Sequence, residues 1–283
     1  MGKGSMRNII LMALSLVFFS CAHKVTHEEV LKVQQEITKE LPELSDAPVI
    51  IEEKKIEKTK VVKKNKESIV KPIVEIKKDS LDIPFKEGEV LSFSAHAKGL
   101  NLGDATFSIK PFQYQGSQKL WHFVFNLETK GFIARFYSLK VTQESWNEFD
   151  TMRPVRFMSM IIENKYQKHF IDSFDYNKKI VFHKEKKEDV EKQMEIAMPS
   201  ELLDSLSAFY LLRIKSDSRK SFVVYEDQVK TVEITNLGKD GADTKFSLAI
   251  QGTPTQYVWI NDKKEIQKVL IQTKNGNVEL RRN

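Results

Sequence analysis

Cysteine is nearly absent from this chain of 283 residues, and the single one is Cys21. One thiol excludes an intramolecular disulfide, and it leaves no cysteine ligand for a zinc site in the remainder of the chain. A lone cysteine close to the N-terminus therefore calls for an explanation by its position.

Motifs for catalysis are absent as well. The sequence has no H-E-x-x-H, no G-x-S-x-G and no glycine-rich phosphate loop. We expect His122 to face away from the aromatic side of its strand, and His169 and His183 to approach each other across a hairpin. Two such ligands are fewer than zinc requires. We interpret Glu148 and Asp150 as solvated carboxylates at an edge rather than as an acid/base pair. The sequence predicts no catalytic residue, metal or cofactor, and an unrecognised hydrolase is the weaker alternative.

Residues 22–82 lack glycine, phenylalanine, tyrosine and tryptophan, and lysine and glutamate dominate them. Such a segment buries too little apolar surface to offset the entropy of ordering it. We predict a disordered tether over 21–82, with a transient helix or docking patch near 30–41. Roughly 60 disordered residues reach about 40–45 Å, so residues 83–283 form a β-rich domain that can stand away from its anchor.

The first twenty residues are typical of an export signal. The apolar run from Ile9 to Phe19 follows Arg7 and is too short to span a bilayer. The sequence Phe18-Phe19-Ser20-Cys21 resembles the lipobox of bacterial lipoproteins, which implies cleavage before Cys21 and lipidation there. The alternatives are an ordinary signal peptide or an uncleaved anchor with an incidental cysteine. Translation starts at Met1 or Met6.

This resemblance predicts a signal peptide over 1–20 and a membrane anchor through lipidated Cys21. The chain would then be a cell-envelope protein that faces the periplasm. Ala22, in place of aspartate, resembles the outer-membrane sorting pattern. The net charge of +6 suits anionic lipid or polysaccharide, and because no nucleic-acid-binding module is recognisable we expect no nucleic acid partner.

Strict alternation of apolar and polar residues dominates the rest of the chain, and it is the period of a half-buried strand. Trp121, Phe123 and Phe125 give the clearest case, whereas 155–160 is undecided because both faces carry apolar residues. Further strands are expected near 91–97, 179–183, 222–225, 229–234, 246–250, 256–260, 266–271 and 278–280. Turns are expected at 101–104, 115–117, 239–241, 261–262 and 275–276. The pattern predicts an antiparallel meander that forms a curved open barrel or a sandwich.

One helix interrupts the strands near 200–214. Leu202, Leu206 and Phe209 recur at helical spacing. Ser200 or Asp204 would cap its first turn, with a catalytic carboxylate at Asp204 as the weaker interpretation. Trp259 is expected to pack in the core rather than to stack on a ligand.

Several segments in this order resemble the bacterial domain-of-unknown-function family 3108 (DUF 3108), over about 84–280. The resemblance rests on Pro84–Phe93, Gly99, Gly103, Phe136-Tyr137, Ser145, Pro154, Asp204–Arg213, Trp259–Asp262, Lys268-Val269, Gly276 and Leu280. It implies an exported β-rich domain, with no assigned activity and no catalytic residue to carry over.

Two functions therefore compete. The first is a cell-envelope lipoprotein whose non-catalytic β-domain binds a protein or cell-wall partner. The alternative is a carrier or binder of a lipid or other apolar ligand in a curved-sheet cavity. The sequence does not point to individual ligand-binding residues for either function.

Overall fold

The computed structural model describes residues 83–199, 202–225, 227–273 and 276–283. The predicted signal peptide, Cys21 and the tether over 21–82 lie outside these residues. In the described part of the chain, no helix combines the length and the apolar character needed to cross a membrane.

Strands of one sheet make up most of the described domain. In chain order the elements are β1 (Val90–Ala97), β2 (Leu100–Gln115), β3 (Gln118–Thr129), α3 (Gly131–Ala134), β4 (Leu139–Glu148), β5 (Pro154–Glu163), β6 (Tyr166–Asp175), β7 (Ile180–Lys187), β8 (Val190–Ala197), β9 (Leu202–Leu203), α4 (Ser205–Ile214), β10 (Arg219–Tyr225), β11 (Gln228–Asp240), β12 (Asp243–Ile250), β13 (Gln256–Ile260), β14 (Ile266–Thr273) and β15 (Gly276–Arg282).

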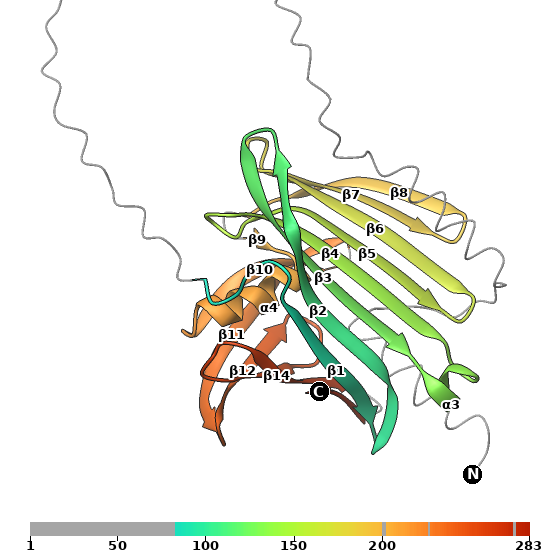
Figure 1. Ribbon diagram of the computed structural model, residues 1–283. Coiled ribbons are helices and arrows are strands. Elements are labelled where there is room, and N and C mark those ends of the chain that lie inside the picture. The colour runs from blue at the N-terminus through green and yellow to red at the C-terminus, as the bar shows by residue number, and fades with distance from the viewer. Residues whose placement is uncertain (1–82, 200–201, 226, 274–275) are drawn as a thin grey trace, which may run out of the picture.

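The sheet consists of two antiparallel meanders joined where the last strand returns to the first. Strands β1 to β8 follow one another, and β10 to β15 lead back until β15 pairs with β1. The short β9 pairs in parallel with β10, so β8 and β9 are the two free edges. The sheet curls without closing (Figure 1). The predicted curved open antiparallel barrel is confirmed, and the sandwich is excluded because one sheet holds all the described strands.

The core lies on the inner face of the curl, which we define as the face that packs on α4. Alternation places Leu91 and Phe93 of β1 and Phe123 of β3 there, each at most 2% exposed. Tyr210 of α4 stacks on Phe123 with ring centroids 3.8 Å apart, and Phe85 meets Tyr210 edge to face at 5.4 Å. The helix therefore fills the space between the two halves of the sheet (Figure 1).

Helix α4 begins later than the sequence predicts. Asp204 is its N-cap and accepts hydrogen bonds from the backbone amides of Leu206 and Ser207, as expected of a capping aspartate. The preceding Leu202 belongs to β9, because its backbone pairs with β10. The other predicted cap, Ser200, lies outside the described residues.

Two kinds of sequence expectation are corrected. The turn expected at 101–104 is wrong, because these residues lie inside β2. The chain reverses instead at Lys98 and Gly99, which both have positive φ. The strands β2, β4, β6 and β8 are not predicted by the sequence. The turn expected at 101–104 falls within β2, and the sequences of β4, β6 and β8 are too polar for an apolar alternation to stand out.

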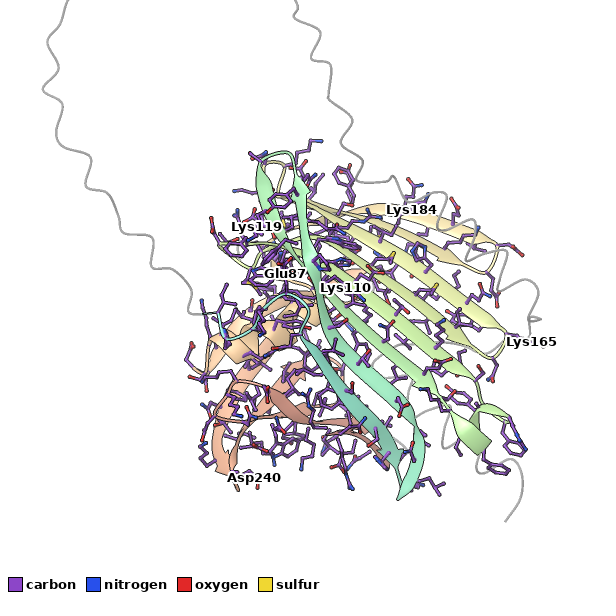
Figure 2. The ribbon with its side chains drawn as sticks, in the orientation of Figure 1. Glu87, Lys110, Lys119, Lys165, Lys184 and Asp240 are labelled. Carbon is purple, nitrogen blue, oxygen red and sulfur yellow. The ribbon has the colours of Figure 1, made fainter. Side chains whose placement is uncertain are left out.

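The β2–β3 hairpin is the longest in the described sheet and projects beyond its neighbours. A register shift between Lys110 and Gln113 bends its outer end. Lys119 marks this end in Figure 2, and Lys165, in the turn after β5, marks the far end of the sheet. The bent tip overhangs the outer face, which is the face opposite α4.

Candidate functional site

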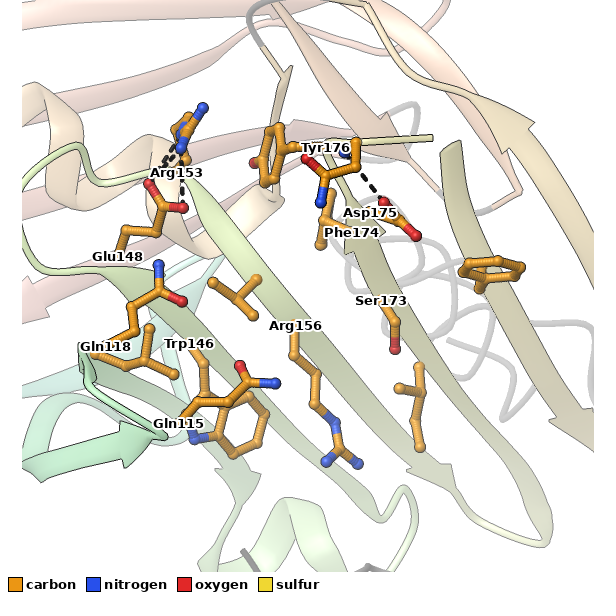
Figure 3. A pocket seen from close by; sticks show the side chains of 15 residues that line it. Gln115, Gln118, Trp146, Glu148, Arg153, Arg156, Ser173, Phe174, Asp175 and Tyr176 are labelled. Atoms are coloured by element: carbon orange, nitrogen blue, oxygen red, sulfur yellow. Dashed lines mark hydrogen bonds and ion pairs between the residues drawn. The ribbon is translucent and has the colours of Figure 1, made fainter. Parts of the chain in front are cut away.

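A groove lies on the outer face of β4 to β7, beneath the tip of the β2–β3 hairpin. We call it the outer groove (Figure 3). Its volume is about 870 Å³. It is lined by Gln115, Gln118, Leu120, Trp146, Glu148, Arg153, Val155, Arg156, Ile171, Ser173, Phe174, Asp175, Tyr176, Asn177 and Phe182.

A small apolar cluster separate from the main core supports the floor. Leu120, Trp146 and Met158 form it, each less than 9% exposed. The indole of Trp146 stacks on His122 at 4.6 Å and donates a hydrogen bond of 2.7 Å to the side chain of Gln113. Because these contacts hold the indole in place, the floor is a rigid surface.

His122 lies on the outer face, as its alternation predicts. Its Nε2 is 2.6 Å from a carboxylate oxygen of Glu144, and the ring is 8% exposed. It therefore serves as a packed support for Trp146.

Arg156 of β5 is the unusual residue of the outer groove. Its guanidinium carbon lies 5.3 Å from the Trp146 ring, and its buried Nε has no hydrogen-bond partner. Among the described residues no carboxylate lies within ion-pair distance of Arg156. Burial lowers the pKa of the guanidinium, and the field of Glu144 partly opposes that shift. The groove thus holds a partly desolvated cation without a counter-ion in contact.

The charges at the rim, in contrast, are paired. Arg153 donates to both carboxylate oxygens of Glu148, at 2.8 and 2.9 Å. Asp175 accepts hydrogen bonds from the backbone amides of Asn177 and Lys178, and these bonds, with the Lys178 ammonium, lower the pKa of its carboxyl. These carboxylates are occupied in holding turns, so Arg156 carries the open charge of the site.

Neutral groups complete the lining. Phe182 of β7 is 39% exposed, which is high for a phenylalanine. Four polar side chains without charge surround the groove and are exposed, namely Gln115, Gln118, Ser173 and Asn177. The site can therefore bury apolar surface, donate and accept hydrogen bonds, and bind one anionic group.

A second polar cluster is buried on the inner face of β5 to β7. His183 Nδ1 lies 2.6 Å from a carboxylate oxygen of Asp172, and Lys168 pairs with Glu185 at 2.8 Å. Burial raises the pKa of Asp172, against the opposing effect of His183. Ser159 shares this face, but its buried hydroxyl has no hydrogen-bond partner. Because the serine does not contact the histidine, the cluster is not a nucleophile–base pair.

The expected approach of His169 and His183 is wrong. His183 pairs with Asp172 across the β6–β7 hairpin, so it lies on the inner face, whereas His169, three residues before Asp172, points outward. Successive side chains of a strand alternate between faces, so His169 and Asp172, three residues apart, lie on opposite faces. His183 shares the face of Asp172 and is therefore separated from His169. Within the described residues, no group of three or more metal-ligating side chains forms a metal site.

Trp259 is 5% exposed but lies on the outer face, away from the main core. Its indole donates a hydrogen bond of 2.9 Å to Asp240, and the Lys268 ammonium lies 3.7 Å from the ring centre. Trp259 is therefore buried, as expected, but it packs against Asp240 and lysine side chains on the outer face and not in the main core.

The outer groove is not predictable from the sequence alone. Its one signal was the 155–160 segment, where both faces carry apolar residues. The structure explains that pattern, since Met158 packs in the outer cluster while Phe157 packs in the main core.

Taken together, the fold and the outer groove define a curled open β-domain with one amphipathic, cationic site on its outer face. The model of the family "Protein of unknown function (DUF3108)" matches residues 92–281. The chain belongs to this family, as the sequence resemblance predicts.

Similarity to individual proteins is distant. No curated protein matches the chain in sequence. The fold is similar to the crystal structure of a β-barrel-like protein of domain of unknown function DUF1849 from Brucella abortus, at 7% identity and a TM-score of 0.48, with 69% of this chain and 94% of that chain covered.

Proposed function

We propose that this protein is a cell-envelope lipoprotein whose non-catalytic β-domain binds a protein or cell-wall partner in the outer groove. Cys21 would carry the lipid, and the 21–82 segment would let the domain reach its partner in the periplasm, with the outer membrane as the favoured location. The observation that carries the proposal is Arg156, a partly buried cation that has no counter-ion in contact among the described residues.

Physical chemistry supports a binding role for such a residue. Desolvating a cation without an opposite charge costs free energy, and a ligand anion can recover that cost. Arginine and aromatic side chains such as Phe182 also dominate the energetics of binding surfaces. The exposed position of the groove suits a partner too large to be enclosed.

The carrier alternative stays a prediction. It places an apolar ligand on the inner face, where Phe93, Phe107 and Phe209 pack against one another with ring centroids 5.6 Å apart. A ligand there has to displace these rings. Native mass spectrometry of the protein from the envelope, with and without organic extraction, tests this alternative.

The binding proposal is tested with the full chain in mild detergent. Phe182→Ser changes the groove, and Val190→Ser is the matched control, because Val190 is an exposed apolar residue of the next strand, outside the groove. Bound protein is quantified on isolated cell-wall sacculi and by chemical crosslinking to envelope proteins. We expect Phe182→Ser to lower the bound fraction several-fold and Val190→Ser to leave it unchanged. Equal loss, or no loss, in both variants would contradict the proposal.

A further inference from the structure

We propose that the outer groove binds a glycan whose sugars carry a carboxylate and an N-acetyl group. This inference rests on the function proposed above, because it names the chemical class of the cell-wall partner. The carboxylate, the sugar ring with its hydroxyls, and the N-acetyl methyl each correspond to a different part of the groove lining (Figure 3).

The carboxylate corresponds to Arg156. A guanidinium presents a planar fork of donors that matches a carboxylate in two parallel hydrogen bonds. Arg156 is held against Trp146, so less conformational freedom is lost when a ligand binds. The other arginine of the groove, Arg153, is already occupied by Glu148. The groove therefore favours a ligand with a single carboxylate at Arg156 over a ligand that carries many negative charges.

The sugar ring and its hydroxyls correspond to the neutral lining. The C–H face of a pyranose is apolar and can cover the exposed ring of Phe182, which removes apolar surface of both partners from water. Each sugar hydroxyl both donates and accepts hydrogen bonds, so the groove must offer acceptors and donors. Side-chain amides supply both. Gln115 and Gln118 provide them from the β2–β3 hairpin, and Asn177 provides one from the turn between β6 and β7.

The N-acetyl methyl corresponds to the aliphatic part of the floor. Val155 and Ile171 are partly buried and pack on the outer cluster, and both line the groove together with Arg156 and Ser173. This patch is small and is bordered by polar groups, which suits a methyl group better than an acyl chain. Because the groove is a surface depression, an internal segment of a polymer can enter it without a free end.

The test compares two disaccharides that differ by one group. The first is N-acetylglucosamine linked to N-acetylmuramic acid, and the second is di-N-acetylglucosamine, which lacks the lactyl carboxylate. Dissociation constants are measured by ligand-observed NMR titration against the full chain in detergent. We expect the acidic disaccharide to bind the wild type about tenfold more tightly, as one charge-assisted pair allows.

Two arginine variants assign the preference to its residue. Arg156→Gln should abolish the difference between the two sugars, and Arg156→Lys should retain part of it, because lysine keeps the charge without the fork. Arg281→Gln is the control, since Arg281 lies on β15 and pairs with Glu279. Circular dichroism of each variant checks that the domain is folded.

The outcomes separate this inference from the proposed function. Equal affinity of the wild type for both disaccharides, or a preference that survives Arg156→Gln, overturns the glycan assignment. If neither sugar binds while Phe182→Ser still releases a crosslinked envelope protein, the partner is a protein, and the groove proposal stands without the glycan. If Phe182→Ser has no effect on any partner, both proposals fail.

Discussion

At the scale of single residues, Gly103 shows how close backbone approach constrains sequence. It lies inside β2, and a Cβ built there would overlap the backbone carbonyl of Glu128 on β3. We predict that Gly103→Ala lowers the free energy of unfolding by about 3 kcal/mol, because the two strands must separate locally. Urea denaturation measures this loss.

Gly116 provides the control for that prediction. It also has positive φ, but a Cβ there has open space around it. Gly116→Ala should therefore cost only the backbone strain of a left-handed conformation, about 1 kcal/mol. If the two variants lose equal stability, steric overlap at Gly103 is not the cause.

Asp204 is a second residue with a measurable consequence. The Ser145 hydroxyl has one proton but lies 2.6 Å from two oxygens, Oδ1 of Asn147 and Oδ2 of Asp204. Asn147 donates its amide to the Met152 carbonyl, which fixes its oxygen toward the serine. Burial raises the pKa of Asp204 to about 6, although the hydrogen bond that the Ser145 hydroxyl donates to Oδ2 and the amides of the first helical turn oppose that shift.

The pH dependence of stability follows from that shift. The unfolded carboxyl loses its proton near pH 4 and the folded one near pH 6, so stability from this group is greatest below pH 4 and declines as pH rises to 6. Asp204→Asn mimics the protonated form and still caps α4. We predict that the free energy of unfolding of Asp204→Asn, relative to the wild type, increases by roughly 2 kcal/mol between pH 4 and pH 7. Denaturation series at both pH values measure it, and a difference independent of pH would contradict the shifted pKa.

At the scale of elements, strands in which apolar and polar residues alternate clearly are predictable from the sequence, and strands without that alternation are not. Strand β3 alternates aromatic and polar residues along its length, and its existence and inner face were predictable. Strand β8 has three charged residues among eight and is mostly exposed, so it shows little apolar alternation, and its pairing with β7 defines it as a strand. The floor of the outer groove depends on contacts between β3, β4 and β5, and no single segment encodes that proximity.

The placement of α4 depends on one buried arginine. Arg213 has a fully buried side chain, and its two guanidinium NH2 groups donate to the two carboxylate oxygens of Glu89, just before β1. Its Nε donates a hydrogen bond of 2.6 Å to the Lys264 carbonyl, in the turn between β13 and β14. One side chain thus joins the helix to the start of β1 and to the β13–β14 turn.

We predict that Arg213→Lys destabilises the protein by about 2–4 kcal/mol, because lysine cannot make this set of bonds and leaves buried groups unpaired. Urea denaturation followed by circular dichroism measures the change. Arg281→Lys, which alters an exposed pair with Glu279, should leave the unfolding midpoint unchanged. A similar midpoint for both variants would show that Arg213 does not fix the helix.

At the scale of the whole molecule, the sheet approaches closure without pairing its edges. The ion pair between Lys192 of β8 and Asp227, before β11, measures 2.7 Å and brings the edge strand β8 against the returning half. Edge strands invite pairing with other chains, and charged side chains oppose it. Glu191, Lys192 and Glu195 of β8 are exposed charged side chains, and they oppose the pairing of another chain along that edge.

The proposed lipid anchor at Cys21 can be tested directly. We predict that the wild type incorporates a clickable fatty acid and begins at Cys21, whereas Cys21→Ala incorporates none and retains residues 1–20. Ser20→Ala keeps a small residue before the cleavage point and should remain labelled, so it separates loss of the thiol from a general defect in export. Fatty-acid labelling and mass spectrometry of the N-terminal peptide measure both properties. Label that persists in Cys21→Ala would place the lipid elsewhere, and a wild type without label would make the protein an ordinary exported one. In either case the folded domain should give the same circular dichroism spectrum, because the core cluster between Phe85 and Leu280 is unchanged in sequence.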